Sequence, residues 1–211
     1  MNDEPPVAPA IILGTIGPEP EGATPLNEED LKGLLPDFVA TRADLNQVEY
    51  ENIAKALPWA YRQARMLGPT GLFEYSFLFN LHRRMFADVW KWAGTQRVRE
   101  TNIGVAPSQV PSQVKATLDD ARFWHANGHL PVDERAARLH HRLVSVHPFP
   151  NGNGRCTRLL ADLYLVSLGH DPFTWGSTRL DEQSELRDAY IKSLLAAHDD
   201  DLKPLIAFAR S

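Results

Sequence analysis

The sequence predicts an all-α fold, a bundle of about seven to eight helices with a short β-hairpin and an extended Pro-rich N-terminal arm. Three observations predict this class. Beyond residue 41, apolar residues recur mostly at spacings of three and four. Only the stretch from residue 97 to 111 looks extended. The 211 residues, 43% hydrophobic and 23% charged, have the composition of an ordinary globular chain with one domain and an appendage.

The N-terminal arm is predicted over residues 1–40. Seven of the 16 prolines precede residue 37, and proline prevents regular helix or central strand. Apolar residues within this stretch predict an arm that wraps the domain or a partner, and we expect packing on its own domain. A helix over residues 41–66 follows, with Thr41 as its N-cap, and we expect Pro58 to interrupt or kink it.

Six further helices follow from apolar periodicity. One carries Leu78, Leu81 and Met85 and ends at Gly94, another ends at Gly128, and a third follows Pro131 and runs into His147. A helix from about Asn153 to Gly169 is apolar on most sides, which predicts a central, buried position. Two closing helices are predicted from Leu186, Tyr190 and Leu194 and from Leu202, Ile206 and Phe208.

Charge and cysteine content exclude several classes of protein. The chain has 22 Lys and Arg against 27 Asp and Glu, a net charge of −5, so no global basic field attracts nucleic acid or an acidic membrane. The lone Cys156 excludes an intramolecular disulfide and fits a reducing compartment. No run approaches the roughly 20 apolar residues of a membrane helix. We expect a soluble, cytoplasmic protein.

The informative segment runs from His147 to Arg155 and reads His-Pro-Phe-Pro-Asn-Gly-Asn-Gly-Arg. Gly152 and Gly154 let backbone N–H groups converge on one point, and the following helix directs its positive dipole end to the same place. This pattern predicts an anion site, with phosphate as its usual occupant. Arg155 and Arg158 lie early in that helix, from which their guanidinium groups can reach further phosphate oxygens.

His147 ends the preceding helix and faces this turn. Phosphoryl or nucleotidyl transfer to a hydroxyl needs a positioned base and neutralised charge. The sequence therefore predicts His147 as the base of such a transfer.

The same segment resembles the signature of the Fic (Fido) family, His-x-Phe-x-(Asp or Glu)-Gly-Asn-Gly-Arg, whose members mostly move AMP from ATP to protein hydroxyls. Six of its seven specified positions match, and Arg158 supplies the second arginine that often follows. The resemblance covers roughly residues 73–209 and implies the Fic fold. With residues 22–53 included, the whole chain is similar to the subgroup called mobile mystery protein B.

The resemblance implies a role for each matching residue. His147 deprotonates the hydroxyl of a Ser, Thr or Tyr on a protein target, and a flap with Ile103 and Gly104 pins that target as an extended strand. ATP is the substrate and Mg²⁺ its companion. The phosphate-binding residues would be Gly152, Asn153, Gly154, Arg155 and Arg158.

Asn151 departs from the family pattern, because it stands where Asp or Glu holds Mg²⁺. An amide oxygen can ligate the ion, but it lacks the negative charge. Two alternatives therefore stay open: a phosphotransferase like the related Doc-type toxins, or a catalytically weak, toxin-like module that binds nucleotide. The second alternative would fit a toxin–antitoxin pair with a DNA-binding protein carried on the same mobile element. The partner we expect is such a DNA-binding protein or a second copy in a homodimer.

An internal brake is a further expectation. Many Fic proteins carry an inhibitory helix with the pattern (Ser or Thr)-x-x-x-Glu-(Gly or Asn), whose glutamate pairs with the second arginine. Residues 47–52 resemble this pattern, with Glu51 and Asn52 in place and Gln47 at the first position. The resemblance implies that Glu51 pairs with Arg158 in the resting state.

Overall fold

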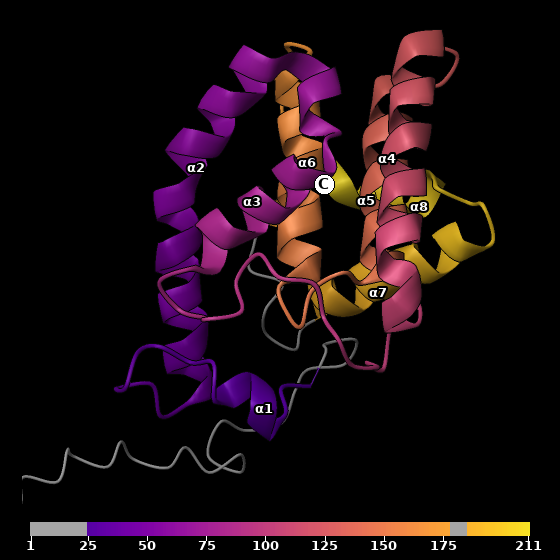
Figure 1. Ribbon diagram of the computed structural model, residues 1–211. Helices are drawn as coiled ribbons and strands as arrows, with labels where there is room; N and C mark the ends of the chain where they lie inside the picture. The colour runs from indigo at the N-terminus through magenta and orange to yellow at the C-terminus, as the bar shows by residue number, and fades with distance from the viewer. Residues whose placement is uncertain (1–24, 178–184) are drawn as a thin grey trace, which may run out of the picture.

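A computed structural model describes residues 25–177 and 185–211 (Figure 1). These residues form eight α-helices and no β-sheet, with one isolated bridge between Leu34 and Trp90. The all-α prediction is confirmed. In chain order the helices are α1 (Glu28–Leu31), α2 (Arg42–Leu72), α3 (Tyr75–Phe86), α4 (Val110–Asn127), α5 (Val132–Val146), α6 (Asn153–Ser167), α7 (Glu185–His198) and α8 (Lys203–Ala209).

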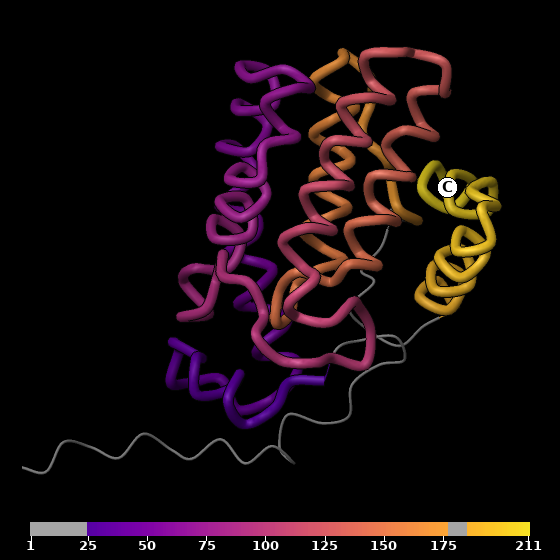
Figure 2. Tube along the Cα trace, turned by 45° about the vertical axis from the view of Figure 1, so that its right-hand side comes forward, coloured from indigo at the N-terminus to yellow at the C-terminus, as the bar shows by residue number. Residues whose placement is uncertain are grey.

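Helix α6 is the centre of the bundle, between α2 on one side and α5 on the other (Figures 1 and 2). Its buried residues face all directions around the axis, as expected for a helix that contacts neighbours on every side. They include Cys156, which is fully buried. The predicted central position of this helix is confirmed.

Helix α2 begins as predicted but is not interrupted where we expected. Thr41 is its N-cap, and Thr41 and Asp44 form a reciprocal capping box. The helix continues through Pro58 and departs from helical geometry at Gly68, where φ is +62°. A proline removes one backbone hydrogen bond, whereas a residue with positive φ changes the direction of the chain.

The remaining helices follow the predicted pattern, with one shorter than expected. Helix α3 ends at Phe86, so the apolar residues Val89 and Trp92 belong to the turns after it. Gly128 closes α4 in the left-handed conformation. The two closing helices, α7 and α8, are present and pack against each other (Figure 2). Within the described residues, no helix combines the length and apolarity that crossing a membrane would require.

The extended arm is not confirmed. Residues 1–24 lie outside the described part, and residues 25–40 are not extended throughout, because α1 interrupts them. Asn27 and Asp30 form a capping box that stabilises this single turn. Beyond it, the chain packs on its own domain: Leu35 N–H donates to Val89 O (2.9 Å) and Lys91 N–H donates to Gly33 O (2.8 Å).

The predicted β-hairpin is not confirmed either. Residues 97–106, which we name the flap loop, contain no strand. Their backbone bonds leave the loop instead of pairing within it: Arg97 N–H donates to Pro148 O (3.0 Å) and Val105 N–H donates to Val146 O (3.4 Å). The β-forming residues Val98, Ile103 and Val105 thus lack a partner strand, because the end of α5 takes that place.

Candidate active site

His147 lies directly after the last residue of α5 and adopts the left-handed conformation, with φ +57° and ψ +62°. Its N–H still donates to Leu143 O (3.1 Å), so it caps the helix in the position that glycine usually occupies. A non-glycine residue here costs about 1–3 kcal/mol of backbone strain, which surrounding contacts must offset. Pro148 then prevents the helix from continuing.

The imidazole of His147 is buried, with 6% of the residue exposed. Its Nδ1 lies 3.2 Å from Val144 O and donates to it, so Nε2 is the unprotonated nitrogen of the neutral ring. Burial lowers the pKa of His147 to about 4, and the nearby Arg97 charge adds to this effect. At neutral pH the ring is therefore in the form that accepts a proton.

The segment His147–Arg155, which we name the anion loop, is closed by its own side chains. Asn153 accepts a hydrogen bond from Phe149 N–H (2.9 Å) and donates one to Phe149 O (2.8 Å). Gly152 has φ +75°, and a Cβ on it would lie 2.6 Å from the Phe86 ring. Glycine is thus required there for both conformation and space. The Asn153 side chain holds the loop, so only its backbone N–H can face a phosphate.

His82 on α3 contacts the anion loop and helps to hold it in place. The sequence alone did not identify this residue. Gly94 N–H donates to His82 Nδ1 (2.9 Å), so Nε2 carries the proton and donates to Asn151 O (3.0 Å). The His82 ring also stacks on Phe149, 3.8 Å between centroids. Burial lowers the pKa of His82 to about 3, which keeps it neutral. A histidine in register with Leu78 and Met85 was the available signal.

The first N–H groups of α6 have no intrahelical acceptor. Asn151 Oδ1 accepts from Gly152 N–H (2.6 Å), and the N–H groups of residues 153–155 follow it around the helix start. A side chain at position 154 would begin 3.4 Å from Arg158 Nη1, so Gly154 keeps the space between those N–H groups and Arg158 open. The Arg158 guanidinium lies over the Tyr190 ring, 5.1 Å from its centroid.

Glu49, not Glu51, is the carboxylate that pairs with an arginine of the site, so the predicted pairing of Glu51 with Arg158 is wrong. Glu49 accepts from Arg155 Nη1 (2.6 Å) and from Trp90 Nε1 (2.7 Å), while its side chain is 4% exposed. Glu51 is exposed and accepts from Gln47 Nε2 (2.7 Å).

Helical phase explains this correction. Position 49 follows the buried Leu45 by four residues and precedes the buried Ala56 by seven, which places all three on one face of α2. Position 51 is two residues further and therefore points about 200° away, toward solvent. A glutamate in the apolar register of an amphipathic helix was the signal that the analysis missed.

One solvent-open cavity of about 930 Å³ brings the other predicted residues together. His147, Asn151, Arg155 and Glu49 line it, as do Ile103 and Gly104 of the flap loop. The remaining predicted members of its lining are Gly152, Asn153, Gly154 and Arg158. Tyr50, Ile53 and Leu57 on α2 add an apolar wall. The cavity therefore has a basic end rich in N–H groups and an apolar surface beside it. A ligand with both a phosphate and an apolar group fits such a cavity.

The side chains present do not fit a magnesium site held by the protein. Asn151 Oδ1 already accepts from Gly152 N–H and lies 3.3 Å from Arg155 Nη2, a cation. The carboxylate of Glu49, which lines the same cavity, is bonded through both oxygens. Mg²⁺ sites usually include one or two carboxylates. Among residues 25–177 and 185–211, no cluster of three or more His, Cys, Asp or Glu could hold a metal ion.

This arrangement can bind an anion and accept a proton beside it. The helix start and two arginines supply positive potential for several phosphate oxygens. A neutral imidazole shares the same cavity. These are the requirements of phosphoryl or nucleotidyl transfer to a hydroxyl.

Residues 72–165 match the model of the Fic/DOC family. Protein adenylyltransferase fic-1 of Caenorhabditis elegans is 34% identical over 139 residues, which cover 62% of this chain and 25% of the relative. Protein adenylyltransferase Fic of Drosophila grimshawi is 31% identical over 137 residues, covering 62% and 26%. The chain thus spans about a quarter of the length of these curated relatives.

Solved structures show the same fold. A fragment of C. elegans Fic-1 superposes with a TM-score of 0.61 at 28% identity, covering 77% of this chain and 48% of the fragment. The Bartonella tribocorum BepC protein, solved with bound AMPPNP, superposes with a TM-score of 0.62 at 16% identity and covers 95% of this chain and 96% of BepC.

Proposed function

Because the family model and these solved structures support a Fic/DOC domain in this chain, we propose that it transfers AMP from ATP to a hydroxyl group of a protein. One observation carries the proposal: a neutral, buried imidazole shares a cavity with the start of α6 and with Arg155 and Arg158. The naming of the curated relatives as protein adenylyltransferases supports the choice of AMP.

The reaction follows from the positions of these groups. Nε2 of His147 takes the proton from the target hydroxyl as its oxygen attacks the α-phosphorus of ATP. A new bond joins that oxygen to the α-phosphorus, and the bond to the oxygen bridging the β-phosphate breaks. AMP stays on the target and pyrophosphate leaves. The imidazolium then returns its proton to solvent or to pyrophosphate.

The phosphates of ATP would bind at the start of α6. Backbone N–H groups of residues 153–155 would hold the α- and β-phosphates, and the arginines would neutralise the charge that develops on pyrophosphate. Arg158 lies over Tyr190 beside Gly154, close to this position. No step of this proposal passes through a metal ion.

Nucleotide binding would also exchange the partner of Arg155. In the structure its guanidinium is bonded to Glu49. A phosphate can replace that carboxylate as acceptor, which leaves Glu49 with Trp90 alone. Glu49 would therefore be the brake that the sequence analysis assigned to Glu51, acting on the first arginine instead of the second.

Labelled ATP tests the proposed function. Incubation with ATP labelled at the α-phosphate should place label on protein, and ATP labelled at the γ-phosphate should not. Label from the γ-phosphate alone would mean phosphotransfer. Nucleotide binding with neither label on protein would mean a binding module. Either of these two results would reject AMP transfer. Mass spectrometry then locates the modified Ser, Thr or Tyr.

Finer assignments rest on the resemblance of the chain from residue 22 onward. We retain as proposals the mobile mystery protein B subgroup, a toxin–antitoxin setting and a DNA-binding partner or homodimer. Co-purification with a DNA-binding protein encoded beside this chain tests the toxin–antitoxin setting. A stable complex supports that setting, and separate elution contradicts it.

A further inference from the structure

We propose that Arg97 is a positioning residue that fixes His147 and the flap loop in one arrangement across the cavity. This inference rests on the proposed function in so far as His147 is the base. It concerns a residue that the sequence analysis assigned no role, and it stands on a set of hydrogen bonds that joins two segments about 50 residues apart.

Arg97 first holds the end of α5. Its Nε donates to His147 O (2.5 Å) and its Nη2 donates to Val146 O (3.3 Å). The last carbonyls of a helix have no intrahelical donor, so Arg97 acts as a side-chain cap for α5. Its backbone N–H donates to Pro148 O (3.0 Å), the next carbonyl along. Three successive carbonyls around the left-handed His147 are therefore held by one residue.

Arg97 also holds the flap loop. Nη2 donates to Val105 O and Nη1 donates to Arg99 O (2.9 Å). Between them lies Gly104, where an added Cβ would be 2.6 Å from His147 Cβ and 2.7 Å from Arg97 Nη2. The flap backbone thus passes His147 at contact distance. The same guanidinium sets the position of both.

The charge of Arg97 is compensated by dipoles. Arg97 is 3% exposed, and within the described residues it forms no ion pair with a carboxylate. Its guanidinium lies at the C-terminal end of α5, where the helix dipole is negative. Only arginine offers a planar fork with five N–H donors that can reach carbonyls on both segments. Lysine would keep the charge but not this set of directions.

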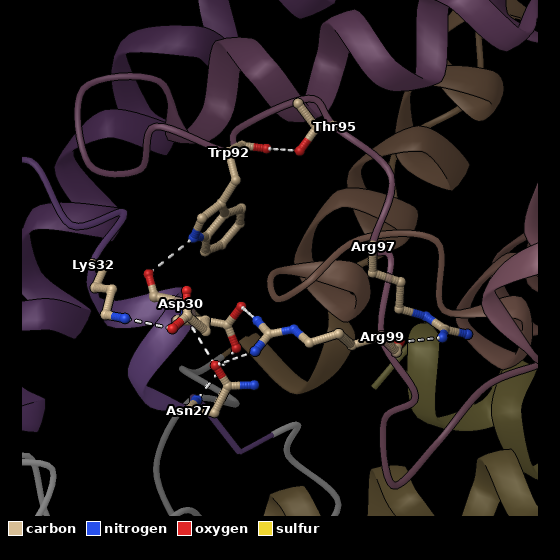
Figure 3. A network of polar contacts seen from close by, with 8 residues as sticks. Asn27, Asp30, Lys32, Trp92, Thr95, Arg97 and Arg99 are labelled. Carbon is tan, nitrogen blue, oxygen red and sulfur yellow. Dashed lines mark hydrogen bonds and ion pairs between the residues drawn. The ribbon is translucent and has the colours of Figure 1, made fainter.

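The network extends outward to α1 (Figure 3). The side chain of Arg99 donates to Asn27 Oδ1 (2.7 Å) and pairs with Asp30 (2.5 Å), which is buried. Trp92 Nε1 donates to Asp30 O (3.2 Å). The flap loop is therefore held at its inner side by Arg97 and at its outer side by α1.

Steady-state kinetics of AMP transfer tests the role of Arg97. Arg97→Gln should lower kcat at least tenfold and leave the KM for ATP within about twofold, because the hydrogen bonds of Arg97 go to residues 99, 105 and 146–148 and not to the phosphate-binding residues. Arg97→Lys should recover only part of kcat. Arg210→Gln is the matched control: Arg210 also holds backbone carbonyls, those of Asp171 and Pro172, but lies outside the cavity, so kcat should stay unchanged.

A readout independent of activity separates this inference from the proposed function. Hydrogen exchange of residues 98–106 should accelerate at least tenfold in Arg97→Gln and not in Arg210→Gln. Unchanged exchange, or an unchanged kcat in a variant that melts cooperatively, would overturn the inference. If the wild type transfers no label, the proposed function fails, but hydrogen exchange still tests whether Arg97 holds the flap loop. Should Arg97→Gln not fold, Arg97→Lys carries both measurements.

Discussion

The anion loop and the flap loop line the same cavity, yet they are held in different ways. The anion loop is closed by residues within it, since Asn153 bonds both backbone groups of Phe149. The flap loop has internal bonds as well, from Arg97 and Thr101, but Arg97 also binds carbonyls at the end of α5, and Arg99 binds α1. A bond between residues four apart, such as that of Asn153 to Phe149, leaves a local sequence signature, whereas bonds to partners far along the chain do not.

The largest effect is expected at His147, where the two loops meet. His147→Ala should lower the rate of AMP transfer by about 100-fold or more, the usual contribution of a general base. Nucleotide affinity, measured by calorimetry, should change little because the N–H groups of α6 remain. Transfer at the wild-type rate would remove His147 from the proposed mechanism.

Asn153 tests how strongly the anion loop depends on its own side chains. Asn153→Ala leaves the buried N–H and C=O of Phe149 without partners, so the free energy of unfolding should fall by about 2–4 kcal/mol. Thr101→Ala in the flap loop removes a single bond to Ile103 O (2.6 Å) and should cost about 0.5–1 kcal/mol. Urea denaturation measures both. Equal losses would contradict the contrast between the loops.

Acid should weaken the anion loop through His147 within it and His82 of α3, which packs against it. The folded pKa values of His147, about 4, and His82, about 3, lie below the ordinary value of 6.5. The folded state thus carries no ionisation penalty above pH 6.5, and the penalty grows as pH falls toward those values. From pH 7 to 5 each ring should remove about 2 kcal/mol of stability, at 1.36 kcal/mol per pKa unit.

Melting curves at pH 7 and pH 5 test this prediction, with His82→Gln expected to lose about 2 kcal/mol less than the wild type over the same interval. Asp162 opposes the trend, because burial raises the pKa of its carboxyl to about 7. Asp162→Asn should therefore make the acid sensitivity steeper. An identical pH dependence in wild type and His82→Gln would reject the assignment to His82.

Glu49 and Glu51 offer a smaller and sharper comparison on α2. Glu49→Gln can still accept from Trp90 but loses the charge that holds Arg155, so ATP affinity should rise about tenfold, or 1.4 kcal/mol. Glu51→Gln, on the exposed face, should leave affinity unchanged. Calorimetric titration with ATP distinguishes them, and the reverse ranking would restore Glu51 as the brake.

The smallest effect is expected at Asn151. Asn151→Asp adds a carboxylate to the anion loop beside the phosphate position, which should make transfer severalfold more responsive to added Mg²⁺. Asn151→Ser is the uncharged control. An unchanged Mg²⁺ response in Asn151→Asp would show that Arg155 neutralises the new charge.

Sequence periodicity predicted most of the fold and the local part of the site. The stripes of α3 to α8, the caps at Thr41 and Gly128 and the central α6 depend on neighbours along the chain, and these predictions are confirmed. The flap loop was wrongly predicted as a hairpin because its hydrogen-bond partners lie about 45 residues away.

The brake was assigned to Glu51 instead of Glu49 for the same physical reason. The Glu-Asn pair at positions 51 and 52 matched a motif, but the face of α2 that meets α6 is set by Leu45, Glu49 and Ala56. A buried charged residue among apolar ones becomes meaningful only when its distant partner, here Arg155, is known. Arg97 was missed for a related reason, since carbonyl partners leave no mark in a sequence.

Because Cys156 is buried, its reaction with a thiol reagent can report when α6 opens. It is the single cysteine, it is fully shielded next to Arg155 in the first turn of α6, and burial raises the pKa of its thiol. A thiol reagent can therefore reach it only when α6 separates from its neighbours. Because no other thiol competes, the rate of labelling measures how often α6 opens, without any engineered probe.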